Sequence, residues 1–151
     1  MRVSVRLSLL IGVVLACAAG ARAAESLTPL LDPYFRIQSA LTDDKTEGVQ
    51  ADATLIATEA RSLGAGGEAI AAAATGLSAT ADIAAARAAF SKLSDALIAY
   101  AEQTKATTGD GVTAMYCPMV KKSWLQKGTA VKNPYFGKSM QSCGEKKKTA
   151  A

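Results

Sequence analysis

The sequence contains no histidine, and this absence narrows the range of functions more than any other single feature. A Ser-His-Asp triad, a Cys-His nucleophile pair and HExxH zinc chemistry all require an imidazole. Long apolar runs are also missing, because after residue 23 no stretch reaches the 18 or so apolar residues that a membrane span needs. The length of 151 residues allows one ordinary domain. We therefore expect a non-enzymatic, single-domain protein.

The first 23 residues have the pattern of a secretory signal peptide. Arg2 and Arg6 precede an apolar run over residues 7–19, and Ala21 and Ala23 supply small side chains at positions −3 and −1 of a cleavage site. We expect a signal peptide over residues 1–23, a periplasmic location and no membrane span after cleavage.

Lipid attachment at Cys17 is an alternative to this cleavage. The stretch Val14-Leu15-Ala16-Cys17 loosely resembles a lipobox, in which the cysteine becomes the lipidated N-terminus. A leucine directly after Val14 fits that pattern poorly, so the sequence favours cleavage after Ala23.

Removal of the signal peptide changes the charge balance. The complete chain has 17 Lys and Arg against 13 Asp and Glu, but three of the arginines lie in residues 1–23. The remaining chain carries a net charge of only +1, so charge gives no argument for nucleic acid as a partner, and we expect none. The charge is polarised, since residues 24–120 hold 6 basic and 12 acidic groups and residues 121–151 hold eight lysines against Glu145.

Apolar residues recur at helical spacing through residues 24–111. Three stripes with steps of three and four positions run over 30–41, 49–63 and 83–100. The alanine-rich segment 68–74 lies between glycines and is expected to connect the second and third stripes. This pattern predicts an all-α fold, an antiparallel bundle of three to four helices with short links.

Local signals predict where these helices begin. Asp32 before Pro33 is typical of a capping acid followed by proline in the first turn, and Asp43 or Asp44 can cap the second helix. The third helix is expected to begin near residues 80–82. These acidic residues are therefore interpreted as helix-end residues without a catalytic role.

Residues 112–145 differ in composition from the bundle. Prolines and glycines interrupt this segment, and it contains four of the eight aromatic residues. We expect an irregular segment of the same domain, which its aromatic side chains pack onto the bundle. A disordered tail is expected over residues 146–151.

All sulfur of the predicted mature chain lies between residues 115 and 143. Thiolate and thioether sulfur are soft donors that select Cu(I) and similar ions. The candidate ligands for such an ion are Cys117, Met119, Met140 and Cys143. Met115 is a spare donor, and the ring of Trp124 is a further candidate contact of the cation, although packing in the core is favoured for it.

The two cysteines also fit a second hypothesis. An exported protein occupies an oxidising compartment, where Cys117 and Cys143 can form a disulfide. Closing a loop of roughly 27 residues would stabilise the fold by on the order of 3 kcal/mol. The protein would then be a structural or interaction domain that docks on an envelope partner through its aromatic, lysine-rich segment. Free thiols without a ligand are the third alternative.

Three separated blocks resemble one known protein family. Two are the helical stretches 33–44 and 84–94, and the third contains Tyr116-Cys117-Pro118-Met119, Trp124-Leu125-Gln126, Asn133-Pro134-Tyr135-Phe136-Gly137, Met140 and Cys143-Gly144. In this order they resemble the DUF3347 family. The resemblance implies a periplasmic domain of uncharacterised biochemistry, found alone or fused to adaptor subunits of heavy-metal efflux systems of the copper and silver type. It associates the chain with metal handling, and with an efflux adaptor or another periplasmic protein as partner.

Overall fold

Four α-helices are followed by three β-strands in the computed structural model, which describes residues 26–147. The helices are α1 (Thr28–Thr42), α2 (Val49–Ala60), α3 (Glu68–Ser78) and α4 (Ile83–Thr104). The strands are β1 (Val112–Cys117), β2 (Lys122–Lys127) and β3 (Glu145–Lys146), and two 3₁₀ helices span Arg61–Gly67 and Gly137–Ser139. The predicted cleavage site and Cys17 lie outside the described residues.

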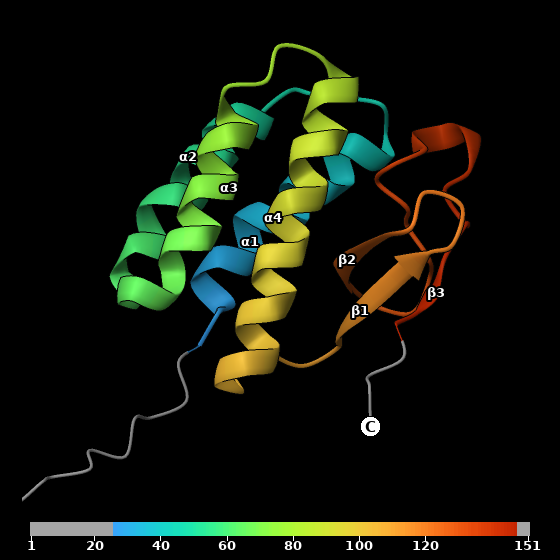
Figure 1. The fold of residues 1–151 in the computed structure, drawn as a ribbon. Coiled ribbons are helices and arrows are strands. Elements are labelled where there is room, and N and C mark those ends of the chain that lie inside the picture. The colour runs from blue at the N-terminus through green and yellow to red at the C-terminus, as the bar shows by residue number, and fades with distance from the viewer. Residues whose placement is uncertain (1–25, 148–151) are drawn as a thin grey trace, which may run out of the picture.

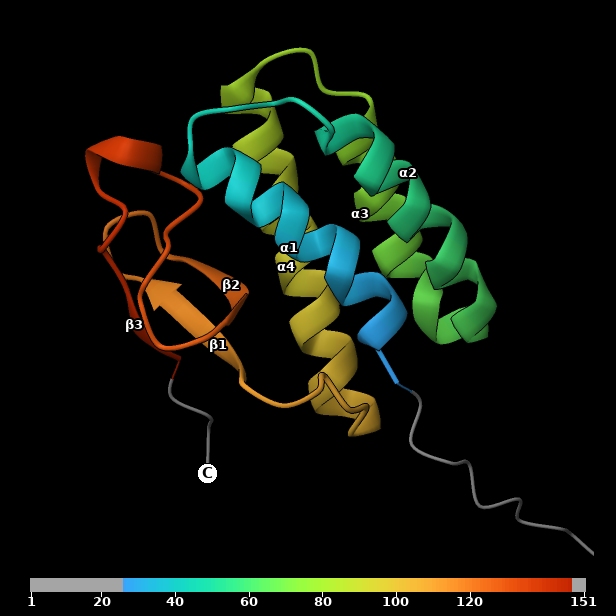
Figure 2. The same ribbon diagram turned by 180° about the vertical axis from the view of Figure 1, so that it is seen from behind.

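Helices α1 and α4 lie in the middle of the molecule. The hairpin of α2 and α3 packs on one side of them, and the sheet packs on the other side (Figure 1). The view from behind shows α1 in front of α4, between the same two neighbours (Figure 2). The sheet therefore rests on a platform of two helices that are distant in sequence.

The predicted helical stripes are confirmed. In α1 the residues Leu30, Tyr34, Ile37 and Leu41 are all buried at helical spacing. The expected connector over 68–74 is a complete helix, since α3 packs against both α2 and α4. Burial of its apolar face explains this, because tertiary packing supplies most of a short helix's stability.

The predicted helix starts were partly wrong. Asp82 does cap α4, since its carboxylate accepts a hydrogen bond of 2.8 Å from the N–H of Ala85. Helix α1, however, begins before Asp32 and continues through Pro33, which costs one helical hydrogen bond. Leu27, directly before the helix, is completely buried. We attribute the start of α1 ahead of the expected cap at Asp32 to this burial. Helix α2 begins after Gly48, whose φ is 78°, and not at an aspartate cap.

The expectation of an all-α fold is wrong. Strands β1 and β2 form an antiparallel hairpin in which Val112 pairs with Lys127 and Cys117 with Lys122. Strand β3 pairs with the other edge of β1, which gives the order β2-β1-β3. The protein is therefore an α+β fold, and the segment predicted to be irregular carries a three-stranded antiparallel sheet within the described residues.

The composition of the strands explains this difference. Val112, Thr113 and Tyr116 in β1 are of types enriched in strands, and the two strands alternate in side-chain direction across a short turn. Lys121 closes that turn with a φ of 54°. The first residues of the predicted tail are also held, since Lys146 pairs with Met115 and the Lys147 ammonium lies 3.2 Å from Glu102.

A buried hydroxyl joins the sheet to the helices. Tyr34 of α1 is completely buried, and its hydroxyl lies 2.7 Å from the Ser94 hydroxyl of α4. It also accepts a hydrogen bond of 2.9 Å from the N–H of Leu125 in β2. One side chain thus connects three elements, and burial raises the pKa of Tyr34 well above its ordinary value, so it stays a neutral donor and acceptor.

Replacement of Tyr34 by phenylalanine is expected to lower the free energy of unfolding by about 1–3 kcal/mol, because the buried N–H of Leu125 loses its acceptor. Urea denaturation measures this change. The control is Tyr116→Phe, because Tyr116 is only half-buried; that variant should change stability by less than about 0.5 kcal/mol. Equal effects of the two substitutions would contradict the role of the Tyr34 hydroxyl.

Candidate functional site

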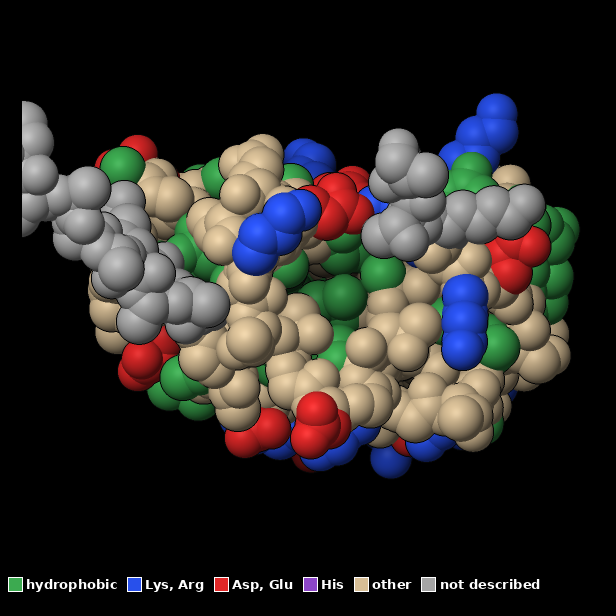
Figure 3. Space-filling view, turned by 90° about the horizontal axis from the view of Figure 1, so that it is seen from below, with side chains coloured by type: hydrophobic (Ala, Val, Ile, Leu, Met, Phe, Trp, Pro, Cys, Tyr) green, Lys and Arg blue, Asp and Glu red, His purple; other side chains and the backbone are tan. Residues whose placement is uncertain are grey.

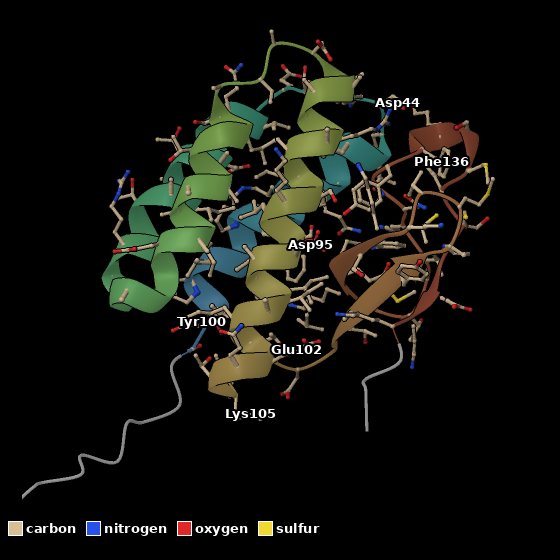
Figure 4. The ribbon with its side chains drawn as sticks, viewed as in Figure 1. Asp44, Asp95, Tyr100, Glu102, Lys105 and Phe136 are labelled. Carbon is tan, nitrogen blue, oxygen red and sulfur yellow. The ribbon has the colours of Figure 1, made fainter. Side chains whose placement is uncertain are left out.

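Two cysteines that are 26 positions apart in sequence meet at one end of the sheet, where its central strand β1 ends. Cys117 is the last residue of β1, and Cys143 lies two positions before β3. Their sulfur atoms are 3.3 Å apart, and both residues are free thiols. Sulfur atoms gather in this part of the molecule, below the labelled Phe136 (Figure 4).

Each cysteine lies at one end of a turn that contains one of the candidate methionines. After β1 the chain turns back, and the N–H groups of Met119 and Val120 point to the Cys117 sulfur. On the other side the N–H of Cys143 donates to the carbonyl of Met140 at 3.2 Å. The fold therefore brings the main chains of all four candidate ligands to one place.

The surroundings of the pair favour a thiolate at Cys117. Burial tends to raise the pKa of the Cys117 thiol, but hydrogen bonds from the N–H groups of Val120 and Met119 lower it. The Cys143 thiol and the Asn133 side chain act in the same direction, and the pKa of Cys117 lies below its ordinary value. The hydrogen bond to Cys117 raises the pKa of Cys143, which keeps its proton longer.

The methionines differ in exposure. The side chain of Met119 is 62% exposed, and Met140 is half-buried. Met115 is buried and lines a pocket of about 290 Å³ on the sheet. Within residues 26–147 no group of three His, Cys, Asp or Glu residues is placed to hold a metal ion, so a site at the cysteine pair needs thioether ligands.

Trp124 lies in the core of the sheet segment. Its side chain is completely buried and meets the ring of Tyr135 edge-on, with centroids 6.0 Å apart. A Cβ atom at Gly144 would come within 2.5 Å of the indole ring, so only glycine allows the chain after Cys143 to pass there. The cation–π contact in this segment is made by Tyr135, whose ring centroid lies 5.4 Å from the Lys122 ammonium.

Arg87 ties the segment before Cys143 to the helices. Its guanidinium donates to the carbonyls of Leu41 and Pro134, each at 2.9 Å, and to Asp44 at 2.6 Å. Asp44 in turn accepts a hydrogen bond of 3.1 Å from the N–H of Lys138. Asp44 and Phe136 accordingly lie at the same end of the molecule (Figure 4). Arg36 likewise pairs with Asp52 across α1 and α2.

This tether gives the stability of the protein a dependence on acid pH. The hydrogen bond from Arg87 lowers the pKa of Asp44 below its ordinary value, so the stabilisation is present above the unfolded pKa of about 3.9. It is lost as the pH falls through the folded pKa. Asp44→Asn should therefore flatten the stability profile below about pH 4, measured by urea denaturation across pH. An unchanged profile in the variant would contradict this assignment.

The face of the molecule seen from below carries charges of both signs. Basic and acidic side chains are interspersed there around apolar side chains in a central hollow (Figure 3). Nucleic-acid-binding surfaces are typically a continuous basic patch. Among residues 26–147, none of the helices combines the length and apolarity needed to cross a bilayer.

The sequence pattern identifies the two cysteines and the methionines as candidates, but it does not identify Asn133, which binds the chain at Cys143. Asn133 is completely buried, and its side-chain amide donates to the Cys143 carbonyl. In the sequence it stands in an Asn-Pro turn signal and in the third block of the family resemblance, and neither assigns it a contact with the cysteines.

These features define a small α+β domain whose distinguishing site is a pair of adjacent thiols accompanied by methionines. Over residues 30–109 the chain matches the family described as "Protein of unknown function (DUF3347)", and it belongs to that family. The suspected resemblance is thereby confirmed for the helical body. The match ends before β1 and does not extend over the cysteines.

Comparison with curated proteins gives no match. Comparison with solved structures gives none either.

Proposed function

We propose that this protein is a non-enzymatic periplasmic domain that binds a soft metal ion, Cu(I), and serves heavy-metal handling or efflux. The observation that carries the proposal is the 3.3 Å separation of two sulfurs that lie 26 positions apart in sequence. Each sulfur lies in a turn that also holds a methionine. The lack of histidine leaves sulfur as the soft donor of this segment.

The proposed ligands are Cys117, Met119, Met140 and Cys143. A metal ion bound at about 2.3 Å from two thiolates holds them roughly 4 Å apart, so the sulfurs must separate only slightly from 3.3 Å. The hydrogen bonds that favour a thiolate at Cys117 supply the negative charge that metal binding requires. Sulfur-only coordination keeps copper as Cu(I) and permits transfer by ligand exchange.

Transfer needs a ligand that a partner can reach. Met119 meets this requirement, because 62% of its side chain is exposed while Cys117 beside it is completely buried. We propose that Met119 is the first ligand to be displaced when the ion passes to an efflux adaptor or to another periplasmic protein. The signal-peptide pattern of residues 1–23 and the family resemblance support the periplasmic location.

Titration of the reduced protein with Cu(I) in the presence of a competing chelator tests the proposal. We expect one Cu(I) ion per chain to be taken from the chelator, since the four ligands form one site. Failure of the reduced, folded protein to take up any Cu(I) would refute metal binding.

A second function is favoured by one specific observation. Cys117 is completely buried and in contact with Cys143, an arrangement that also suits a permanent disulfide in a structural or docking domain. Oxidation would form an S–S bond between the two residues and fix the end of β1 to the chain before β3. Thiol trapping in freshly lysed cells separates the two functions. A pair that is fully oxidised in both copper-replete and copper-starved cells favours docking, and a reduced pair favours metal binding.

A further inference from the structure

We infer that Asn133 is a positioning residue of the cysteine pair, which holds Cys143 against Cys117 through its side-chain amide. This inference deepens the proposed function, since it concerns the same two thiols. It goes beyond that function because it assigns a role to a residue that offers no sulfur and binds no ion.

Asn133 makes two hydrogen bonds to the chain at and before Cys143. Its Nδ2 donates a hydrogen bond of 2.6 Å to the carbonyl of Cys143, and its side chain is among the groups that lower the pKa of Cys117. The backbone N–H of Asn133 donates to the carbonyl of Gln141 at 2.8 Å. The turn that leads into Cys143 is thus held at two points by one residue.

The remaining polar atom of this side chain fixes its orientation. Oδ1 accepts a hydrogen bond of 2.8 Å from the N–H of Tyr135, so the amide cannot turn over without losing that bond. Asn133 is completely buried, and Tyr135 beside it is anchored in the core by its hydroxyl, which donates to the Ser123 carbonyl. The amide nitrogen of Asn133 is therefore held in a fixed direction toward the Cys143 carbonyl.

This arrangement predicts a measurable effect on the thiol–disulfide equilibrium. Oxidation by glutathione disulfide breaks its S–S bond and the two S–H bonds of Cys117 and Cys143. One S–S bond forms in the protein, and two molecules of reduced glutathione carry away the two hydrogens. The equilibrium constant of this exchange reports the effective concentration of one thiol near the other.

The test compares Asn133→Leu with the matched variant Gln126→Leu. Gln126 is also a buried amide of the sheet segment, but its hydrogen bonds go to Trp124, Lys132 and the carbonyls of residues 128 and 130. Both variants are measured at the same pH and against the same glutathione buffer, so the comparison reports the loss of each amide side chain. We expect Asn133→Leu to disfavour the disulfide by at least about tenfold, which corresponds to about 30 mV.

Gln126→Leu should change the same constant by less than about twofold. Equal shifts in the two variants would overturn the inference, because they would reflect general loosening of the segment. No shift in Asn133→Leu would overturn it as well. Far-ultraviolet circular dichroism and Trp124 fluorescence establish whether each variant is folded.

A measurement on the unaltered protein remains decisive if Asn133→Leu does not fold. The side-chain amide protons of Asn133 should exchange with solvent more slowly than those of the exposed Gln103, and their resonances should shift when the cysteine pair is oxidised. Exchange at the rate of Gln103, or resonances insensitive to oxidation, would overturn the inference.

The outcome is independent of metal binding. All measurements are made on metal-free protein, so a failure to bind Cu(I) leaves the role of Asn133 intact. Conversely, an equilibrium that does not depend on Asn133 leaves the Cu(I) titration of the unaltered protein unaffected.

Discussion

Reduced Cys117→Ser and Cys143→Ser proteins are each expected to bind Cu(I) at least about 100-fold more weakly than the unaltered protein. A serine hydroxyl is a hard donor that stays protonated, so each substitution removes one of the two anionic soft ligands. The competition titration with a Cu(I) chelator measures the loss. The chemistry also predicts that the two effects are not additive, because one thiolate alone no longer bridges the two turns.

The methionines provide graded controls for this prediction. Met119→Leu and Met140→Leu should weaken binding by about tenfold each, since a neutral thioether contributes less than a thiolate. Met115→Leu should change the affinity by less than about twofold, because Met115 lines the pocket on the sheet and is not among the proposed ligands. Unchanged affinity in Cys117→Ser, or a loss in Met115→Leu as large as in Met119→Leu, would contradict the proposed ligand set.

Replacement of Trp124 by alanine is expected to destabilise the protein by about 3–5 kcal/mol. The indole is completely buried, lies against the ring of Tyr135 and passes close to the backbone of Gly144. Its removal leaves a cavity in the part of the molecule that carries both cysteines. Small domains have only about 5–15 kcal/mol of stability, so urea denaturation should show a large shift in midpoint.

Two further variants make this result interpretable. Trp124→Phe keeps part of the apolar contact and should lose less, about 1–3 kcal/mol. Leu55→Ala removes a large apolar side chain that is 52% exposed on α2, and it should change stability by less than about 0.5 kcal/mol. A loss in Trp124→Ala no greater than in Leu55→Ala would contradict the assignment of Trp124 as the anchor of the sheet segment.

The helical part of the fold was predictable from local information. The stripe that contains Tyr34 and Ile37 is a property of neighbouring residues, and the cap at Asp82 needs only three residues beyond it. The start of α1 was not predictable in the same way. It depends on the burial of Leu27. The N–H of Leu27 donates to the carbonyl of Thr107, which follows α4 and is distant in sequence.

The sheet was missed because its signals are short and its partners are distant. Strands β1 and β2 have six residues each, and β3 has two. Their stability depends on contacts with helices, such as the bond from the Leu125 N–H to Tyr34, 91 positions away. The glycines and prolines that suggested irregular chain instead lie in the connections around the strands, as Gly144 does beside the indole.

The candidate site was predictable in composition but not in geometry. The clustering of Cys117, Cys143 and the methionines in the sequence made them the candidate ligands, because soft sulfur donors concentrated in one segment indicate a shared metal site. Their approach to 3.3 Å results from the pairing of β3 with β1, which no spacing rule specifies. The position of Asn133 between them depends on the same pairing.

The copper K-edge X-ray absorption spectrum of the reduced protein loaded with Cu(I) tests the central claim most directly. Binding at Cys117, Met119, Met140 and Cys143 predicts a first shell that contains only sulfur, with bond lengths of about 2.3 Å. Oxygen or nitrogen atoms in that shell, or no copper retained after removal of free metal, would contradict the account.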